Sequence, residues 1–330
     1  YVETGAGEGA SFPDSAYKDA GTTIVDSAEE TWSQAELLLK VKEPLESEYK
    51  YLRSDLTVFT YLHLAADRPL AEALVEADTT SIAYETVTDR HGTLPLLTPM
   101  SQVAGRLAVI EGTHHLLSTQ GGRGLLVSGV PGTQPARVVV IGGGQVGASA
   151  VAMAHGLRAE VTVLDLDPHV LQRFDDRYAG GVRTLISDPA TIEKELQEAD
   201  LVIGAVLIPG SAAPKLVREE TVKKMKKGAV LVDVAIDQGG CFENSKKTSH
   251  DDPTFKVHDT LFYCVANMPG AVANTSTRAL SSATLPYIRA VAKDNLDAAI
   301  KRFPGLEGGV MTRGGRLVSE PVRKAFDWDD

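Results

Sequence analysis

Three glycines, Gly142, Gly144 and Gly147, have the spacing G-x-G-x-x-G. They follow a short apolar run at residues 138–141 (VVVI) and precede small residues at 148–156 that are typical of a helix. The first glycine permits a sharp turn, the second lets the backbone approach a pyrophosphate, and the third lets the helix pack closely on the strand. Amides at the start of the helix can bind the phosphate oxygens. The pattern predicts a dinucleotide site.

An acidic residue after the next predicted strand supports this interpretation. Glycines also cluster in ordinary turns, but here Asp165 follows a strand at residues 161–164 (VTVL), roughly 20 residues after the glycines. Its carboxylate can accept both ribose hydroxyls and would repel the extra phosphate of NADP. No arginine follows directly to offset that repulsion, so the sequence favours NAD. Asp167 stays open as an alternative for the same role, or as a solvated loop residue.

Length and composition limit the kind of protein. The chain has 330 residues, of which 43% are hydrophobic, and its length suggests about two domains. The formal charge of −11 argues against a nucleic-acid partner. No apolar run approaches the roughly 20 residues of a membrane span, and no signal segment opens the chain, so we expect a cytoplasmic protein without a membrane partner.

Cysteine and histidine usage predicts no metal site. Cys241 and Cys264 could form one disulfide, but two reduced, buried thiols are expected in a cytosolic protein. Neither belongs to a closely spaced Cys/His cluster of the kind that binds zinc. The pair His114 and His115 occupies adjacent positions of a predicted helix, which face different directions.

Apolar runs of two kinds predict an α/β fold. Uninterrupted runs are typical of parallel strands buried on both faces. Beyond the two already named, they occupy residues 201–206, 229–234 and 261–266. Nearer the start, β-rich runs alternate with a helical pattern and predict a β-α-β unit. Its strands are expected at residues 37–42, 57–63 and 81–87, with the helix at 68–77.

Two long helices are expected to join the parts of the fold. Ser101 can cap a helix that runs to about residue 118, and the second helix covers residues 276–293. We therefore expect a Rossmann-type NAD-binding domain of residues 96–273. It is inserted into a discontinuous α/β substrate domain made of residues 1–95 and 274–330.

Motifs along nearly the whole chain resemble the L-alanine dehydrogenase family, a relative of the NAD-binding subunit of membrane-bound transhydrogenase. The family interconverts L-alanine with pyruvate and ammonia, using NAD, and forms homohexamers; the resemblance implies the same here. The motifs are LKVKEP (39–44), TYLHLAA (60–66), SIAYETV (81–87), PLLTPMSQVAGR (95–106), QGGRG (120–124), DLVIGAVLIPG (200–210), VDVAIDQGG (232–240) and YCVANMPG (263–270).

The resemblance also implies which residues handle the substrate. His63 would hydrogen-bond the substrate carbonyl and exchange a proton with it, as suits an imidazole near neutral pH. Asp237 follows a buried strand at its carboxyl end and would be the base that activates water or ammonia. Lys42 would bind the substrate carboxylate or carbonyl oxygen. Met100 would wall the pocket for the alanine methyl group, and Asn267 would lie beside the nicotinamide.

Each assignment has a structural alternative. A lone histidine at a strand end often serves packing alone. Asp237 could instead cap the amides of Gly239 or Gly240, and Lys42 could share an exposed polar face with Lys40. Closure of the two domains would bring the substrate residues to the nicotinamide. Besides the glycine turn and Asp165, cofactor contacts are expected at Ser101, Ser187, Ile236, Asp237, Asn267 and Met268.

The start of the chain departs from the family pattern. A first strand with a motif that resembles VGVPKE, and an Arg that grips the substrate carboxylate, have no counterpart here. Such a charge-assisted bond is worth roughly 1.5–3 kcal/mol, so substrate capture is expected to weaken by about ten to a hundredfold. The missing strand would also leave apolar surface uncovered in the substrate domain. NAD binding is expected to be normal and alanine turnover weak or absent.

Two other functions fit parts of the pattern. A transhydrogenase subunit shares the domain plan, but the AIDQGG, LKVKEP and LHLAA motifs resemble the dehydrogenase more closely. A non-catalytic NAD-binding module would keep the glycine turn without turnover. The presence of His63 and Asp237 favours an enzyme.

Overall fold

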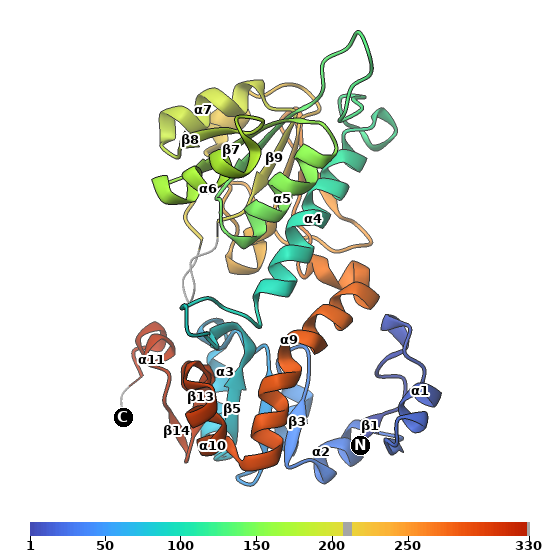
Figure 1. Cartoon of the computed structure of the whole chain (residues 1–330), viewed down its shortest axis with the longest axis vertical. Helices are drawn as coiled ribbons and strands as arrows, with labels where there is room; N and C mark the ends of the chain where they lie inside the picture. Colours follow the sequence, from blue (N-terminus) through green and yellow to red (C-terminus); the bar gives the residue numbers. More distant parts are fainter. Residues whose placement is uncertain (207–212, 329–330) are drawn as a thin grey trace. The chain divides into compact units, whose positions relative to one another are not determined.

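The computed structural model describes residues 1–206 and 213–328 (Figure 1). The described residues form two compact units. The first unit comprises residues 1–99 and 272–330, and the second comprises residues 100–271. Residues 207–210 of the DLVIGAVLIPG motif lie outside the described residues. The domain limits expected from the sequence stay a prediction.

The described part of the second unit is built on a seven-stranded sheet in the order β11-β12-β10-β9-β6-β7-β8. Counted from β6, its parallel strands have the order 3-2-1-4-5-6 of a Rossmann fold, with β11 as an antiparallel edge. The expected α/β class is therefore confirmed. The strands are β6 (Arg137–Ile141), β7 (Glu160–Asp165), β8 (Arg183–Ile186), β9 (Leu201–Gly204), β10 (Val230–Asp233), β11 (Thr254–Val257) and β12 (Thr260–Tyr263).

The centre of this sheet is buried. All residues of β9 and β10 are buried, as expected for parallel strands in an α/β fold. Cys241 and Cys264 are both free and buried, which confirms the expectation of reduced thiols. The helices are α4 (Thr98–His115), α5 (Gln145–Gly156), α6 (Pro168–Tyr178), α7 (Pro189–Glu198) and α8 (Glu219–Val222).

The long helix α4 corrects one expectation. It begins at Thr98, so Ser101 lies inside the first turn and does not cap the helix. Thr98 donates its hydroxyl to the carbonyl of Leu94 at 2.9 Å, and its amide donates there as well. The helix ends at His115 rather than near residue 118, because the chain then turns through a short 3₁₀ segment, Ser118–Gln120.

In the described part of the first unit, a five-stranded sheet has the order β14-β13-β5-β4-β3. β3, β4 and β5 are parallel, and β13, from the end of the chain, pairs antiparallel with β5. A separate two-stranded sheet joins β1 and β2. The strands are β1 (Val2–Glu3), β2 (Ile24–Val25), β3 (Leu37–Leu39), β4 (Thr57–Thr60), β5 (Thr80–Ala83), β13 (Val310–Arg313) and β14 (Arg316–Leu317).

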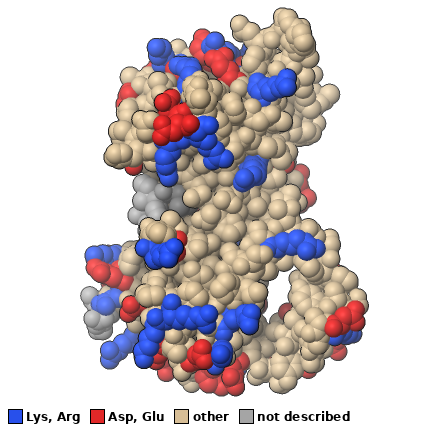
Figure 2. All heavy atoms as spheres, viewed as in Figure 1, with Lys and Arg blue, Asp and Glu red and all other residues tan. Residues whose placement is uncertain are grey.

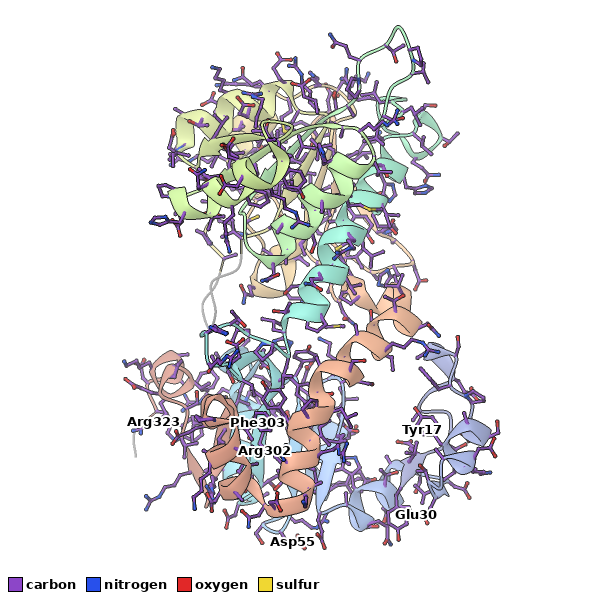
Figure 3. All side chains as sticks on the ribbon, in the orientation of Figure 1. Tyr17, Glu30, Asp55, Arg302, Phe303 and Arg323 are labelled. Atoms are coloured by element: carbon purple, nitrogen blue, oxygen red, sulfur yellow. The ribbon has the colours of Figure 1, made fainter. Side chains whose placement is uncertain are left out.

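Most helices of the first unit bury apolar residues. In α3, Leu70 and Leu74 are completely buried, and Asp67 caps the helix ahead of Pro69. The ring of Phe303, labelled in Figure 3, lies 4.8 Å from that of Tyr287 in α9. The helices are α1 (Asp14–Asp19), α2 (Ala28–Gln34), α3 (Arg68–Glu76), α9 (Ala273–Asp294), α10 (Leu296–Arg302) and α11 (Glu320–Phe326).

Helix composition and surface charge bear on the question of a membrane. Among residues 1–206 and 213–328, no helix combines the length and apolar character of a membrane span. On the face drawn in Figure 2, basic and acidic side chains lie in small groups among uncharged residues.

Candidate functional site

In the glycine turn between β6 and α5, each of the three motif glycines meets a different structural requirement. Gly142 has φ +99°, a conformation that favours glycine, and a Cβ there would lie 2.7 Å from the carbonyl oxygen of Ala205. At Gly147 a Cβ would lie 1.8 Å from the Gly142 oxygen. No described atom lies within 4 Å of a Cβ built at Gly144, so that position faces open space. This open side is where a pyrophosphate can approach the backbone.

Asp165 is tied to the same turn. It ends β7, and its Oδ2 accepts a hydrogen bond from the amide of Gly143 at 2.6 Å. A Cβ on Gly143 would lie 2.5 Å from Cγ1 of Val170. The sequence alone assigned no role to Gly143, the fourth glycine of the turn, although the unbroken run GGG in the motif was a signal. The acidic side chain is therefore held beside the glycine turn.

Asp167 has a structural role at the start of α6, and which of the two aspartates binds the ribose stays a prediction. Its Oδ1 accepts from the amide of His169 at 2.8 Å, so it caps α6. Asp167 is exposed and lies outside any strand or helix, as the interpretation of a solvated loop residue expects, and it also caps α6. Its own amide donates to Oδ1 of Asp165 at 2.9 Å.

The remaining expected cofactor residues lie at several places in the second unit. Ser187 follows β8, and its amide donates to the carbonyl of Asp165 at 2.9 Å. Ile236 is buried in the 3₁₀ turn η6 (Val234–Gln238) after β10, and Met268 is buried at the start of η7 (Met268–Val272). Ser101 is half-buried in α4. The contacts of these residues with a cofactor stay a prediction.

Asp237 and Asn267 are brought together at the carboxyl ends of neighbouring strands. Asp237 lies in η6 after β10, and Asn267 follows β12, which pairs with β10. The amide of Asn267 donates to Oδ2 of Asp237 at 3.3 Å. The side chain of Asp237 is 47% exposed, with the Lys247 ammonium 4.0 Å away. A carboxylate in this place can reach a ligand at the strand ends.

The alternative role for Asp237, as a cap for glycine amides, is not what the structure shows. The amide of Gly239 donates to the carbonyl of Ile236, and that of Gly240 donates to the carbonyl of Ala235.

His63 stands in a strained turn after β4. Its backbone is left-handed, with φ 48° and ψ 35°, and its side chain is exposed. Its amide donates to Oε1 of Glu85 at 2.6 Å. The ring stacks on that of Tyr61, with centroids 6.0 Å apart and planes 8° from parallel. A bulky residue in this conformation marks a functional candidate.

Glu85 is a residue that the sequence interpretation missed. The run SIAYETV was expected to be a strand as far as residue 87, but β5 ends at Ala83 and the 3₁₀ turn Tyr84–Thr86 follows. The turn points the Glu85 carboxylate at the amides of Leu62 and His63. A charged residue inside an otherwise apolar run was the available signal.

Lys42 and Lys40 differ in their surroundings. The Lys40 ammonium pairs with Glu48 at 2.5 Å, whereas the nearest carboxylate to the Lys42 ammonium, from Glu43, is 4.0 Å away. β3 ends at Leu39, so neither lysine belongs to the strand, contrary to expectation. Thr60 donates to the Lys42 carbonyl at 2.9 Å. Lys42 is therefore fixed by its backbone, with an ammonium available to a ligand.

The sequence candidates thus form two groups. Lys42 and His63 follow the adjacent parallel strands β3 and β4, so they share one edge of the first unit's sheet. Asp237 and Asn267 share the corresponding edge in the second unit, together with the glycine turn after β6. Met100 is half-buried in α4. No cluster of three His, Cys, Asp or Glu side chains suited to a metal ion occurs among the described residues.

Comparisons with known proteins agree along the whole chain. Residues 1–104 match the family model "Alanine dehydrogenase/PNT, N-terminal domain", and residues 108–320 match "Alanine dehydrogenase/PNT, C-terminal domain". The alanine dehydrogenase of Mycolicibacterium smegmatis is 55% identical over 99% of this chain and 88% of its own length. That of Mycobacterium tuberculosis is 53% identical over 97% of this chain and 86% of its length.

Solved structures give the same result. A structure titled L-alanine dehydrogenase has a TM-score of 0.94 and 47% identity, covering 99% of this chain and 90% of its own. A transhydrogenase from Sinorhizobium meliloti has a TM-score of 0.83 at 24% identity, over 96% of this chain and 90% of its own, and shows likeness of fold. The Rossmann turn and the family matches together imply a nicotinamide cofactor. The chain belongs to the alanine dehydrogenase/PNT family.

Proposed function

We propose that this protein catalyses the reversible, NAD-dependent oxidative deamination of L-alanine to pyruvate and ammonia. The observation that carries the proposal is the match to alanine dehydrogenases at 53–55% identity over nearly the whole chain. The arrangement of His63, Lys42 and Asp237 at strand ends supports it, because those side chains suit the proton transfers and carboxylate binding that the reaction needs.

NAD is the proposed form of the cofactor. The open face at Gly144 and the amides at the start of α5 would hold the pyrophosphate. Asp165 would accept the ribose hydroxyls, and its negative charge would disfavour NADP. When bound, the nicotinamide supplies the hydride acceptor for the alanine α-carbon.

Residues of the first unit would bind and protonate the substrate. The Lys42 ammonium, 4.0 Å from the nearest carboxylate oxygen, would attract the substrate carboxylate or carbonyl oxygen. His63 would donate a proton to the carbonyl oxygen or take it back, depending on the direction of the reaction. Glu85 holds the amide of His63 and so fixes the place from which the imidazole acts.

Residues of the second unit would handle water and ammonia. Oxidation of alanine gives an imine, which water must attack before ammonia leaves. Asp237, with its exposed carboxylate, would take a proton from that water and orient it. Asn267 would lie beside the nicotinamide, and Met100 would wall the pocket for the methyl group of alanine. A cytoplasmic location and a homohexamer complete the proposal.

The test is a direct assay. Purified protein is mixed with L-alanine and NAD at alkaline pH, and NADH absorbance is followed together with pyruvate and ammonia. Equal amounts of the three products are expected, even where turnover is weak. Tight NADH binding without alanine-dependent NADH formation would favour a non-catalytic nucleotide-binding module. Hydride transfer between NADH and a second nucleotide, without any effect of alanine, would favour the transhydrogenase alternative.

A further inference from the structure

The loop that carries Asp237 closes on a buried carboxylate. Asp233 is the last residue of β10 and is 1% exposed. Residues 234–245, named the acid loop, leave the strand at this point and return to the same side chain. Burial raises the pKa of Asp233, and hydrogen bonds from Ser245 and the Phe242 amide oppose that rise. A charge in this place needs several donors.

The donors come from both ends of the acid loop. Oδ1 of Asp233 accepts from the Ala235 amide at 3.1 Å, just after the strand. Oδ2 accepts from the amides of Cys241 and Phe242, at 2.9 and 3.2 Å. The hydroxyl of Ser245 donates to the same oxygen at 2.5 Å. One side chain therefore fixes the start and the end of the loop.

Lys215 holds the loop from outside. Its ammonium donates to the carbonyl oxygens of Gly239, Gly240 and Phe242, at 2.6, 2.9 and 3.1 Å. These carbonyls follow Asp237 in the chain, whereas the Ala235 amide that bonds Asp233 precedes it. The loop is therefore held on both sides of the exposed acid. Asp237 itself takes no part in either set of bonds.

We propose that Asp233 and Lys215 are positioning residues: together they fix the acid loop so that the Asp237 carboxylate meets the substrate in one orientation. The inference rests on the proposed function of Asp237. Neither residue touches the reacting atoms. Their effect is on the placement of Asp237. Ile236 and Asp237 are expected cofactor contacts, but the pyrophosphate and the ribose are expected at the separate glycine turn and at Asp165, so kcat changes more than the affinity for the dinucleotide.

Two neighbouring glycines provide a matched pair of variants. Gly239 and Gly240 both have positive φ, +89° and +77°, so alanine strains the backbone at either position. A Cβ at Gly240 would lie 2.6 Å from Oδ2 of Asp233, whereas none of the described atoms lies within 4 Å of a Cβ at Gly239. Only Gly240→Ala presses on the positioning carboxylate.

For this pair, kcat with alanine and the Kd of NADH are measured. Gly240→Ala is expected to lower kcat by at least tenfold, and Gly239→Ala by less than threefold. The Kd of NADH is expected to stay within threefold of the wild type in both. Equal losses of kcat in the two variants, or a loss of NADH affinity that parallels the loss of kcat, would overturn the proposal.

Substitutions of the positioning residues give an independent test. Asp233→Asn puts an amide group against backbone N–H donors, and Lys215→Met removes the three outer bonds. Each folded variant is expected to lose at least tenfold in kcat, with faster hydrogen exchange at the amides of Cys241 and Phe242. Retained kcat in a folded variant, or unchanged exchange, would contradict the assignment.

The two proposals fail in different ways. A wild-type protein without alanine-dependent NADH formation overturns the proposed function, and with it the role of the loop in that reaction. The exchange measurement needs no substrate and separately decides whether Asp233 fixes the acid loop. If Asp233→Asn does not fold, the glycine pair decides the effect on kcat.

Discussion

Asp165 and Asp167 lie two residues apart and have different roles. Asp165 binds the Gly143 amide beside the glycine turn, whereas Asp167 caps α6. Asp165→Ala is therefore expected to weaken NAD binding by about ten to a hundredfold. This factor corresponds to the loss of one charged hydrogen bond, which is worth roughly 1.5–3 kcal/mol. Asp167→Ala should cost about 1 kcal/mol of stability and leave NAD affinity within twofold.

Calorimetry of NAD binding and thermal unfolding separates the two aspartates. The assignment of the ribose site to Asp165 would be wrong if Asp167→Ala lost more NAD affinity than Asp165→Ala.

His63 is the second residue with a specific expectation. His63→Gln keeps a polar side chain but no group that exchanges a proton near neutral pH. The kcat with alanine is expected to fall by about 10²–10⁴, the usual contribution of general acid–base catalysis. NADH affinity should be unchanged, because the glycine turn belongs to the other unit. Steady-state kinetics with NADH titration would reject the catalytic role if kcat changed less than threefold.

At the scale of single residues, sequence reasoning found those with a motif and missed those whose role depends on a contact distant in the chain. The glycines and Asp165 belong to one motif with a typical spacing, and the structure brings Asp165 to the glycine turn although it lies 22 residues after Gly143. Glu85 also binds the amide of a residue 22 positions earlier, but no motif links the two residues: the charge inside an apolar run signals that Glu85 needs a partner without identifying it. Asp233 was part of an apolar run, which predicted its burial but not its hydrogen-bond partners.

Among the elements, the turn from β6 into α5 offers the clearest contrast between stability and binding. Gly144 and Gly156, at the start and the end of α5, have no positive φ, and a Cβ added at either would meet none of the described atoms within 4 Å. Alanine at either place should leave the fold intact or stabilise it by about 0.4–1 kcal/mol. Only Gly144→Ala is expected to lower NADH affinity, by at least tenfold, because its methyl group occupies the approach of the pyrophosphate.

Thermal unfolding and NADH titration of both variants check this expectation. Gly156→Ala is the control. Full NADH affinity in Gly144→Ala would mean that the pyrophosphate does not rest against α5.

Elements were predicted better in their centres than at their ends. The first residues of β9, β10 and β12 each lie within one residue of the start of the apolar run that predicted the strand. Each strand ends before its run ends. The apolar residues continue because the loops after the strands are buried too, as Ala205 after β9 and Cys264 after β12 are. Periodicity reports burial, and it cannot distinguish a buried 3₁₀ turn from the end of a strand.

For the whole molecule, pH dependence of stability is expected from a buried histidine. Burial, and then the neighbouring His114, lower the pKa of His115, and its Nδ1 has no hydrogen-bond partner among the described residues. The unfolded state then binds more protons below about pH 6.5, so stability falls as the pH falls from there toward the folded pKa. His115→Gln should flatten the decline of the thermal midpoint between pH 7.5 and about 5.5. An identical pH dependence in wild type and variant would contradict this.

The oligomeric state is a second property of the whole molecule that can be tested. The resemblance implies a homohexamer, which for a chain of 35.2 kDa predicts a particle of roughly six times that mass in light scattering. A monomeric mass at assay concentrations would contradict the proposed hexamer without bearing on the site residues.

This chain is proposed to oxidise L-alanine by transferring the α-hydrogen to NAD. The most direct measurement uses L-alanine deuterated at the α-carbon, with product nicotinamide analysed by mass spectrometry. NADH that carries one deuterium is expected, formed together with pyruvate and ammonia, and the rate is expected to be lower than with ordinary alanine where hydride transfer limits turnover. Unlabelled NADH, or no NADH from a protein that binds the cofactor, would contradict it.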